Sequence, residues 1–306
     1  MKQAVMKVLK WFSIAVVVLA CALGAYMWWV VASFDTQALP ANHGKVAVEL
    51  YAGDEHGAAT GATTKRPLLV GLGGAEGGNA WASPAWSRQR ARFLEQGYAM
   101  LALGYFGAPG TPQKLDRISL DAIHAAILQA AADPRVDGRC IAVIGGSRGA
   151  EAALLLASYF PDIDAVVALV PGSAVFAAGT QAMVTPGFSL HDQPLPFVPV
   201  PWSTTGDLLT GNLRGAFEKM MRDTGAMERA AIAVENINGP ILFVSATRDE
   251  AWPSKEMSDA MMQRLQAHGF AHVAEHIVVE GGHREPLDEF PRIEAFLDAH
   301  FRQVCP

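Results

Sequence analysis

Residues 140–151 read CIAVIGGSRGAE, and the fold of the chain is decided by this stretch. The apolar run Cys140–Gly145 has the composition of a strand that is buried on both faces of a parallel sheet. A helix is expected directly after it, at Ala150–Tyr159. Between the two lies a Gly-x-Ser-x-Gly pattern, in which glycines relieve the crowding of a strained turn that exposes the serine oxygen. The pattern is weak alone, but its position between a strand and a helix indicates that Ser147 is a nucleophile.

Strand-like and helix-like segments alternate on both sides of this stretch. Apolar runs predict further strands at Leu68–Leu72, Tyr98–Gly104, Ala165–Val170, Ile241–Ser245 and His276–Val279. Helices are expected at Ser83–Gln96, which Gly97 ends, and at Asp116–Ala132. This alternation is typical of an α/β fold with a mainly parallel sheet and helices on both faces. We therefore predict one α/β-hydrolase domain over residues 45–306.

A serine hydroxyl becomes a good nucleophile only when a base takes its proton. The base should be a histidine that a carboxylate holds, in the chain order Ser, Asp, His for this fold. Asp249 and His283 follow the last two predicted strands. Both would lie at the carboxyl ends of strands, where sites in open α/β sheets form. The sequence therefore predicts a triad of Ser147, Asp249 and His283, with Glu250 as the alternative carboxylate.

The oxyanion that forms when serine attacks a carbonyl needs hydrogen-bond donors. One donor is expected to be the backbone N–H of Arg148, directly after the nucleophile. The other is expected in the glycine-rich turn GGAEGG at residues 73–78, with Ala75 favoured and Glu76 as its alternative. The glycine spacing matches neither a phosphate loop nor a dinucleotide-binding fingerprint. We expect no cofactor and no metal site.

The segment from about residue 173 to residue 239 breaks the alternation. It contains several prolines with interleaved aromatic residues, followed by a helical stretch near Leu213–Met227. An insertion this long between two core strands is typical of a lid over an active site. The alternative is an excursion that merely packs on the domain.

The N-terminus differs in composition from the rest of the chain. Residues 1–10 are followed by an uncharged apolar run at Trp11–Phe34. As a helix, this run would extend for about 36 Å, whereas the hydrocarbon core of a bilayer is about 30 Å thick. We predict a single transmembrane anchor at residues 11–34 and a linker at residues 35–44. A cleaved signal peptide, or a lipoprotein signal ending at Cys21, is the alternative.

The orientation of this anchor follows from the distribution of positive charge. Lys2, Lys7 and Lys10 precede the apolar run, whereas Lys45 alone stands in the similar stretch after it. Positive residues favour the cytoplasmic side of a membrane. The N-terminus is therefore expected in the cytoplasm and the catalytic domain on the non-cytoplasmic side.

Composition narrows the range of partners. The chain has 306 residues and a formal net charge of -6, without the basic footprint of a nucleic-acid-binding protein. Cys21, Cys140 and Cys305 are too far apart to indicate a disulfide framework or a metal pair. The expected partners are a small-molecule acyl substrate and the membrane, and no nucleic acid.

The residues from about Arg66 to Arg302 resemble the C-terminal α/β-hydrolase domain of the acyl-CoA thioesterases and bile acid-CoA:amino acid N-acyltransferase. Four segments carry the resemblance: residues 73–78 (GGAEGG), 97–103 (GYAMLAL), 145–151 (GGSRGAE) and 249–254 (DEAWPS). The resemblance implies the same three catalytic positions. The serine is more similar to the thioesterases than to the acyltransferase, which has cysteine there. The N-terminal β-sandwich that is usual in the family is not expected here, because an anchor takes its place.

These observations predict a serine hydrolase that cleaves an ester- or thioester-type acyl bond through an acyl-enzyme. Acyl transfer to an amine or alcohol would use the same triad. A non-catalytic, membrane-tethered binding protein could also use this fold. Acyl-CoA is a cytosolic metabolite, so the expected topology favours an ester or lipid-like acyl substrate.

Overall fold

The computed structural model describes residues 2–52, 65–302 and 305. A seven-stranded sheet forms its centre, in the order β1-β3-β2-β5-β6-β9-β10. The strands are β1 (Ala47–Tyr51), β2 (Arg66–Leu72), β3 (Ala99–Gly104), β5 (Val136–Gly146), β6 (Ala165–Leu169), β9 (Ile241–Ala246) and β10 (Ala274–Val279). All neighbours pair in parallel except β1, which runs antiparallel to β3 at one edge. Each strand predicted from an apolar run is present, so the mostly parallel α/β fold is confirmed.

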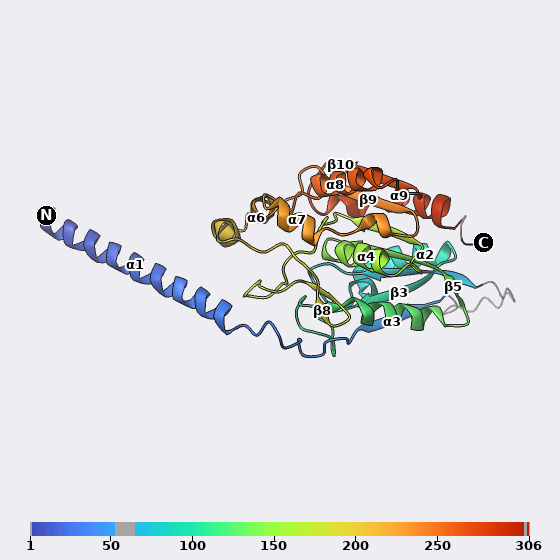
Figure 1. Ribbon diagram of the computed structural model, residues 1–306, viewed down its shortest axis with the longest axis horizontal. Coiled ribbons are helices and arrows are strands. Elements are labelled where there is room, and N and C mark those ends of the chain that lie inside the picture. Colours follow the sequence, from blue (N-terminus) through green and yellow to red (C-terminus); the bar gives the residue numbers. More distant parts are fainter. Residues whose placement is uncertain (1, 53–64, 303–304, 306) are drawn as a thin grey trace.

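Helices cover both faces of this sheet (Figure 1). On one face, α3 (Leu120–Ala131), α4 (Arg148–Tyr159) and α8 (Ser254–Ala267) contribute to one apolar core. On the other face, α2 (Ser87–Glu95) and α9 (Phe290–Phe296) contribute to a second core. Short helical turns complete this layer: η1 (Ala80–Ala82), η2 (Pro84–Trp86), η5 (Glu285–Asp288) and η6 (Leu297–Phe301).

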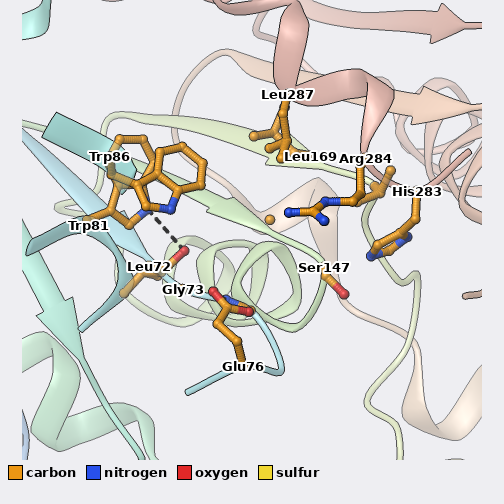
Figure 2. Close-up of a pocket in the computed structure, with 13 residues that line it drawn as sticks. Leu72, Gly73, Glu76, Trp81, Trp86, Ser147, Leu169, His283, Arg284 and Leu287 are labelled. Carbon is orange, nitrogen blue, oxygen red and sulfur yellow. Dashed lines mark hydrogen bonds between the residues drawn. The ribbon is translucent and has the colours of Figure 1, made fainter. Parts of the chain in front are cut away.

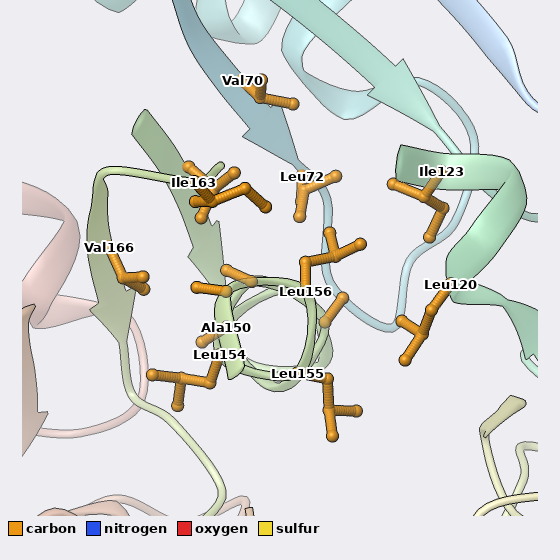
Figure 3. Close-up of a cluster of buried hydrophobic side chains, with 14 of the residues drawn as sticks. Val70, Leu72, Leu120, Ile123, Ala150, Leu154, Leu155, Leu156, Ile163 and Val166 are labelled. Carbon is orange, nitrogen blue, oxygen red and sulfur yellow. The ribbon is translucent and has the colours of Figure 1, made fainter. Parts of the chain in front are cut away.

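Helix α4 is the most deeply buried helix element near the site. Every residue from Arg148 to Ala157 is buried, and Leu154, Leu155 and Leu156 project from it in different directions into the core (Figure 3). Apolar side chains surround the helix on all sides. This packing fixes the position of its N-terminal end relative to the carboxyl end of β5.

The two predicted helices before the elbow are shorter than expected. The first turn of the stretch expected at Ser83–Gln96 forms the separate turn η2, which ends before α2 begins. The stretch expected at Asp116–Ala132 begins as the short strand β4 (Ile118–Ser119). The helix α3 starts only after it, because the Ser119 side chain accepts a hydrogen bond from the backbone N–H of Ala122 and caps the helix.

Residues 173–239 connect β6 to β9, and we refer to this segment as the cap; its last part, with Val234 and Ile237, packs into the main core. It contains β7 (Phe188–Leu190), β8 (Gln193–Pro194), η3 (Trp202–Thr204), α5 (Thr205–Thr210), α6 (Leu213–Met220), α7 (Thr224–Ala230) and η4 (Val234–Asn236). The strands β4, β7 and β8 make a small second sheet. The single helix expected near Leu213–Met227 is divided in two, because Asp223 begins and caps α7.

The first helix, α1 (Lys2–Ser33), extends away from the domain (Figure 1). Its residues Leu9–Ser33 are long and apolar enough to cross a membrane, and the scored window of that stretch is not buried against the protein. An apolar N-terminal helix is thus present where the sequence predicts one.

A disulfide joins Cys140 in β5 to Cys305, across a Cα–Cα distance of 5.7 Å. The expectation that the cysteines form no legible pair is therefore corrected. The two residues are 165 positions apart in the sequence, so only the tertiary fold brings them together.

Candidate active site

The turn between β5 and α4 holds Ser147 in a backbone conformation that residues with a side chain rarely adopt. Its φ is 55° and its ψ is −120°. The backbone N–H of Ser147 donates to the carbonyl of Leu169 on the neighbouring strand, at 2.9 Å. Strain of this kind persists only where the surroundings fix it, and it is concentrated at functional sites.

Two glycines make this turn possible because their neighbours leave no space for a side chain. A Cβ on Gly145 would lie 2.1 Å from the carbonyl oxygen of Gly149, and a Cβ on Gly149 would lie 2.4 Å from that of Gly73. By contrast, a Cβ on Gly146 would meet nothing closer than 4.0 Å. The first and last glycines of the Gly-x-Ser-x-Gly pattern are therefore sterically required, whereas the middle one is not.

Asp249 and His283 are brought into direct contact at the carboxyl ends of β9 and β10. The His283 Nδ1 and Asp249 Oδ1 atoms are 2.8 Å apart. Asp249 is fully buried, and its Oδ1 also accepts the backbone N–H of Ala251 at 3.0 Å. Burial alone would raise the pKa of the Asp249 carboxyl, but the hydrogen bonds from His283 and Ser254 outweigh it and lower that pKa. The carboxylate is thus ionised and aimed at the imidazole.

Glu250, the alternative carboxylate, contacts the backbone of His283 and not its ring. Its Oε2 accepts the backbone N–H of His283 at 2.9 Å. It therefore holds the loop that carries His283, whereas the contact with the ring is made by Asp249.

Ser147 and His283 line the same cavity of about 400 Å³ (Figure 2). Trp81 and Trp86 form one end of this cavity, and Ser147 and His283 lie together at the other. Between these two described side chains the structure has no hydrogen bond. Such contacts are often long in the absence of substrate and shorten when it binds.

The turn after β2 lies directly against Ser147. A Cβ on Gly74 would be 3.5 Å from the Cβ of Ser147. The hydroxyl of the buried Tyr105 donates to the Gly73 carbonyl at 2.6 Å, and this hydrogen bond holds the turn in place. Ala75 lies at the exposed tip of this turn, and Arg148 is the first residue of α4. In the described part of the chain, neither of these two backbone N–H groups has an acceptor.

Glu76 closes this turn with its own side chain. Its Oε1 accepts the backbone N–H of Gly74 at 2.9 Å. The residue lines the cavity with Ser147 and also a second cavity of about 500 Å³. The sequence indicated Glu76 only as an alternative backbone donor, and its carboxylate was not anticipated as part of the wall.

The second cavity lies between the elbow and the cap. Ala75 and Arg148 belong to its wall on the side of the elbow. The cap contributes mainly apolar side chains: Phe176, Met183, Val200, Leu208, Leu213, Phe217 and Met220. The two cavities therefore flank the turn of Ala75 and Glu76, and the larger one has the apolar wall that an acyl chain would require.

A buried ion pair connects the elbow to the base of the cap. Arg148 and Glu151 are both buried, and the Arg148 Nη1 and Glu151 Oε2 atoms are 2.8 Å apart. Burial raises the pKa of Glu151 to about 7, against the positive charge of Arg148. The same carboxylate accepts the backbone N–H of Phe176 at 3.3 Å. Sequence reasoning assigned Arg148 only its backbone N–H, and the spacing of the pair at i and i+3 was the available signal for this contact.

A second Ser–His–Asp arrangement occurs away from the cavities. Ser245 Oγ lies 2.6 Å from His276 Nε2, and His276 Nδ1 lies 3.2 Å from Asp259 Oδ1. Ser245 is fully buried within the regular strand β9, and burial lowers the pKa of His276. Because this serine lines neither cavity and has no strained turn, we interpret the arrangement as a structural link between β9, β10 and α8.

Comparisons with known proteins agree with this architecture. The sequence profile of the family described as "BAAT / Acyl-CoA thioester hydrolase C terminal" matches residues 120–305. A peroxisomal succinyl-coenzyme A thioesterase of Mus musculus is 30% identical over 216 residues, which cover 69% of this chain and 45% of that protein. Acyl-coenzyme A thioesterase 1 of Homo sapiens is 26% identical, over 67% of this chain and 47% of that protein. The chain thus spans about half the length of these curated relatives.

Solved structures support the fold alone. A puromycin-hydrolysing peptidase of Mycobacterium tuberculosis aligns with a TM-score of 0.55 at 17% identity, over 82% of this chain and 37% of that one. An esterase of Pyrococcus furiosus aligns with a TM-score of 0.52 at 17% identity, over 78% of this chain and 84% of that one.

The geometry of the elbow predicts different outcomes for its glycines. Gly149→Ala should destabilise the fold by more than about 2 kcal/mol, because its Cβ would overlap the backbone of the turn after β2. Gly146→Ala, the matched control, should change the free energy of unfolding by less than about 1 kcal/mol. Urea denaturation of both variants measures this difference, and similar losses in the two would contradict the packing described for the elbow.

Proposed function

We propose that this chain, which belongs to the BAAT / acyl-CoA thioester hydrolase C-terminal family, is a membrane-anchored serine hydrolase. Its substrate would contain an ester- or thioester-type acyl bond. The observation that supports this most is the contact of 2.8 Å between His283 Nδ1 and Asp249 Oδ1, because His283 lines the same cavity as Ser147. A histidine oriented in this way presents its other nitrogen to the cavity as a base.

In the proposed reaction, Ser147 Oγ attacks the acyl carbonyl while His283 Nε2 takes the hydroxyl proton. Asp249 keeps the proton of the imidazole on Nδ1 and stabilises the imidazolium that forms. The backbone N–H groups of Ala75 and Arg148 donate to the oxyanion. His283 then protonates the leaving alcohol or thiol, and a water molecule that it activates releases the acid from the acyl-enzyme.

Acyl transfer is the second candidate function. An acyl-coenzyme A amino acid N-acyltransferase of Mus musculus is 28% identical over 173 residues, which cover 56% of this chain and 39% of that protein. The same acyl-enzyme would then react with an amine in place of water. Two cavities that flank the nucleophile provide space for both an acyl chain and a second group.

We further propose that α1 spans the membrane and that the domain lies on the non-cytoplasmic side. The lysines before the apolar run support this orientation. The disulfide between Cys140 and Cys305 supports it independently, because disulfides persist in oxidising compartments and are rare in the cytosol. On that side of the membrane an ester or lipid-like substrate is accessible, whereas acyl-CoA is not.

Replacing the nucleophile should abolish activity without unfolding the protein. Ser147→Ala removes the attacking oxygen and almost no volume, so hydrolysis of p-nitrophenyl esters should fall to the background rate while the melting temperature is retained. Ser245→Ala is the control, because it removes a serine that is also close to a histidine. Activity that survives in Ser147→Ala, or is lost in Ser245→Ala instead, would overturn the assignment.

The two neighbouring carboxylates should differ in their effect on kcat. Asp249→Asn should lower kcat by about 10⁴-fold, because the amide cannot hold the imidazole in the required tautomer. Glu250→Gln keeps an acceptor for the backbone N–H of His283 and should have a much smaller effect. Steady-state kinetics of both variants on one ester decides between them, and the reverse ranking would make Glu250 the acid of the triad.

The proposed topology predicts that a protease added to the non-cytoplasmic side of a sealed membrane vesicle digests the domain. It also predicts that, in denaturant, Cys140 and Cys305 are alkylated only after a reductant is added. A domain that is protected, with both thiols free, would place it in the cytoplasm and restore acyl-CoA thioesters as the leading substrate. Hydrolysis of acyl-CoA and of long-chain esters, measured side by side, completes this test.

A further inference from the structure

The outer end of the cap, residues 201–213, exposes large apolar side chains to solvent; we refer to these residues as the cap tip. Trp202, Leu209 and Leu213 are 69%, 70% and 44% exposed. Asp207 is the one charged residue in the cap tip, and it forms an ion pair with Lys219 and accepts a hydrogen bond from Asn212. The surface is thus apolar and carries no unpaired charge.

Such a surface is unusual where a protein faces only water. Single exposed apolar residues are common, but a group of them marks a binding surface. Tryptophan and leucine are side chains that enter the interface of a bilayer, and the one acidic residue of the cap tip is neutralised by Lys219.

The end of α1 is attached to the domain close to the cap. The guanidinium group of Arg117 lies over the ring of Phe34, 5.9 Å from its centroid, and its Nη1 donates to the carbonyl of Thr36 at 2.8 Å. The backbone N–H of Arg117 donates to Pro186 in the cap at 2.9 Å, and its carbonyl accepts the hydroxyl of Ser189 at 2.9 Å. One buried residue therefore connects the point where α1 ends to the cap.

This attachment places the cap on the side of the domain from which α1 leaves (Figure 1). We propose that the cap tip docks on the surface of the bilayer that α1 spans, and that the cavity behind it receives an acyl chain from a lipid-like substrate in that bilayer. The proposal rests on the proposed membrane span and acyl hydrolase activity. In this proposal the cap tip binds a lipid surface, and the substrate enters the cavity from the bilayer.

The lining of the larger cavity supports this route. Leu213 is exposed at the cap tip and also lines the cavity, together with Leu208 from the same part of the cap. The cavity continues past Phe217 to Ala75 and Arg148, at the proposed oxyanion site. An acyl chain that enters between Leu208 and Leu213 would thus remain in contact with apolar side chains until its carbonyl reaches the nucleophile.

Docking can be measured without any activity. The full-length chain, with Cys21→Ala as background, is labelled with an environment-sensitive fluorophore at Leu209→Cys and reconstituted in vesicles that contain nitroxide-labelled lipid. The matched control carries the label at Leu128→Cys, because Leu128 is 43% exposed on α3, away from α1. The lipid should quench the label at position 209 severalfold more strongly than the label at position 128. Equal quenching would overturn the proposal, and a crosslinked dimer through position 209 would assign the surface to a second copy.

The route of the substrate is tested by kinetics in the same vesicles. Leu209→Asp should lower kcat/KM for a long-chain ester in the bilayer by about tenfold, which corresponds to about 1.4 kcal/mol. A short, water-soluble ester should be hydrolysed at the unchanged rate, and Leu128→Asp should change neither. An equal loss on both esters would overturn the route. Quenching at position 209 in a chain that hydrolyses no ester would refute the proposed function alone, whereas hydrolysis without quenching would refute the docking alone.

Discussion

The close approach of the chain around Ser147 is the constraint on which the site depends. Gly149 passes within contact of the carbonyl of Gly73, and the carbonyl of Gly149 in turn fills the space beside Gly145. This packing holds Ser147 at a φ of 55° and brings the turn of Ala75 against it. Because α4 is buried on all sides, the strain cannot relax by movement of the helix. The serine oxygen therefore remains exposed to the cavity.

The same helix, α4, also holds the base of the cap in position. Arg148 and Glu151 form a buried pair, and Glu151 accepts a hydrogen bond from Phe176 at the base of the cap. Breaking a buried pair leaves an uncompensated charge, which is costly, so the pair fixes the position of the cap relative to the elbow. The cavity between them consequently has a fixed wall on the side of Ala75 and Arg148 and an apolar, exposed edge at the cap tip.

The strands and the elbow could be predicted from the sequence because both depend on local pattern. An apolar run predicts a buried strand wherever it occurs, and Gly145 and Gly149 mark a turn that only glycine permits. Contacts that depend on tertiary packing could not be predicted in this way. Cys140 and Cys305 are brought together only by the completed sheet and C-terminal segment. Asp249 and Glu250 are adjacent, and only the shape of their turn decides which of them meets the ring of His283.

Ser147 and Ser245 both lie near a histidine and an aspartate, and our central claim is that only Ser147, which has the strained backbone, reacts. Mass-spectrometric mapping of the protein after treatment with a fluorophosphonate tests this claim most directly. We predict a single adduct, on the peptide that contains Ser147, because its oxygen faces a cavity whereas that of Ser245 is fully buried. An adduct on Ser245, or a native protein that forms no adduct, would contradict this claim.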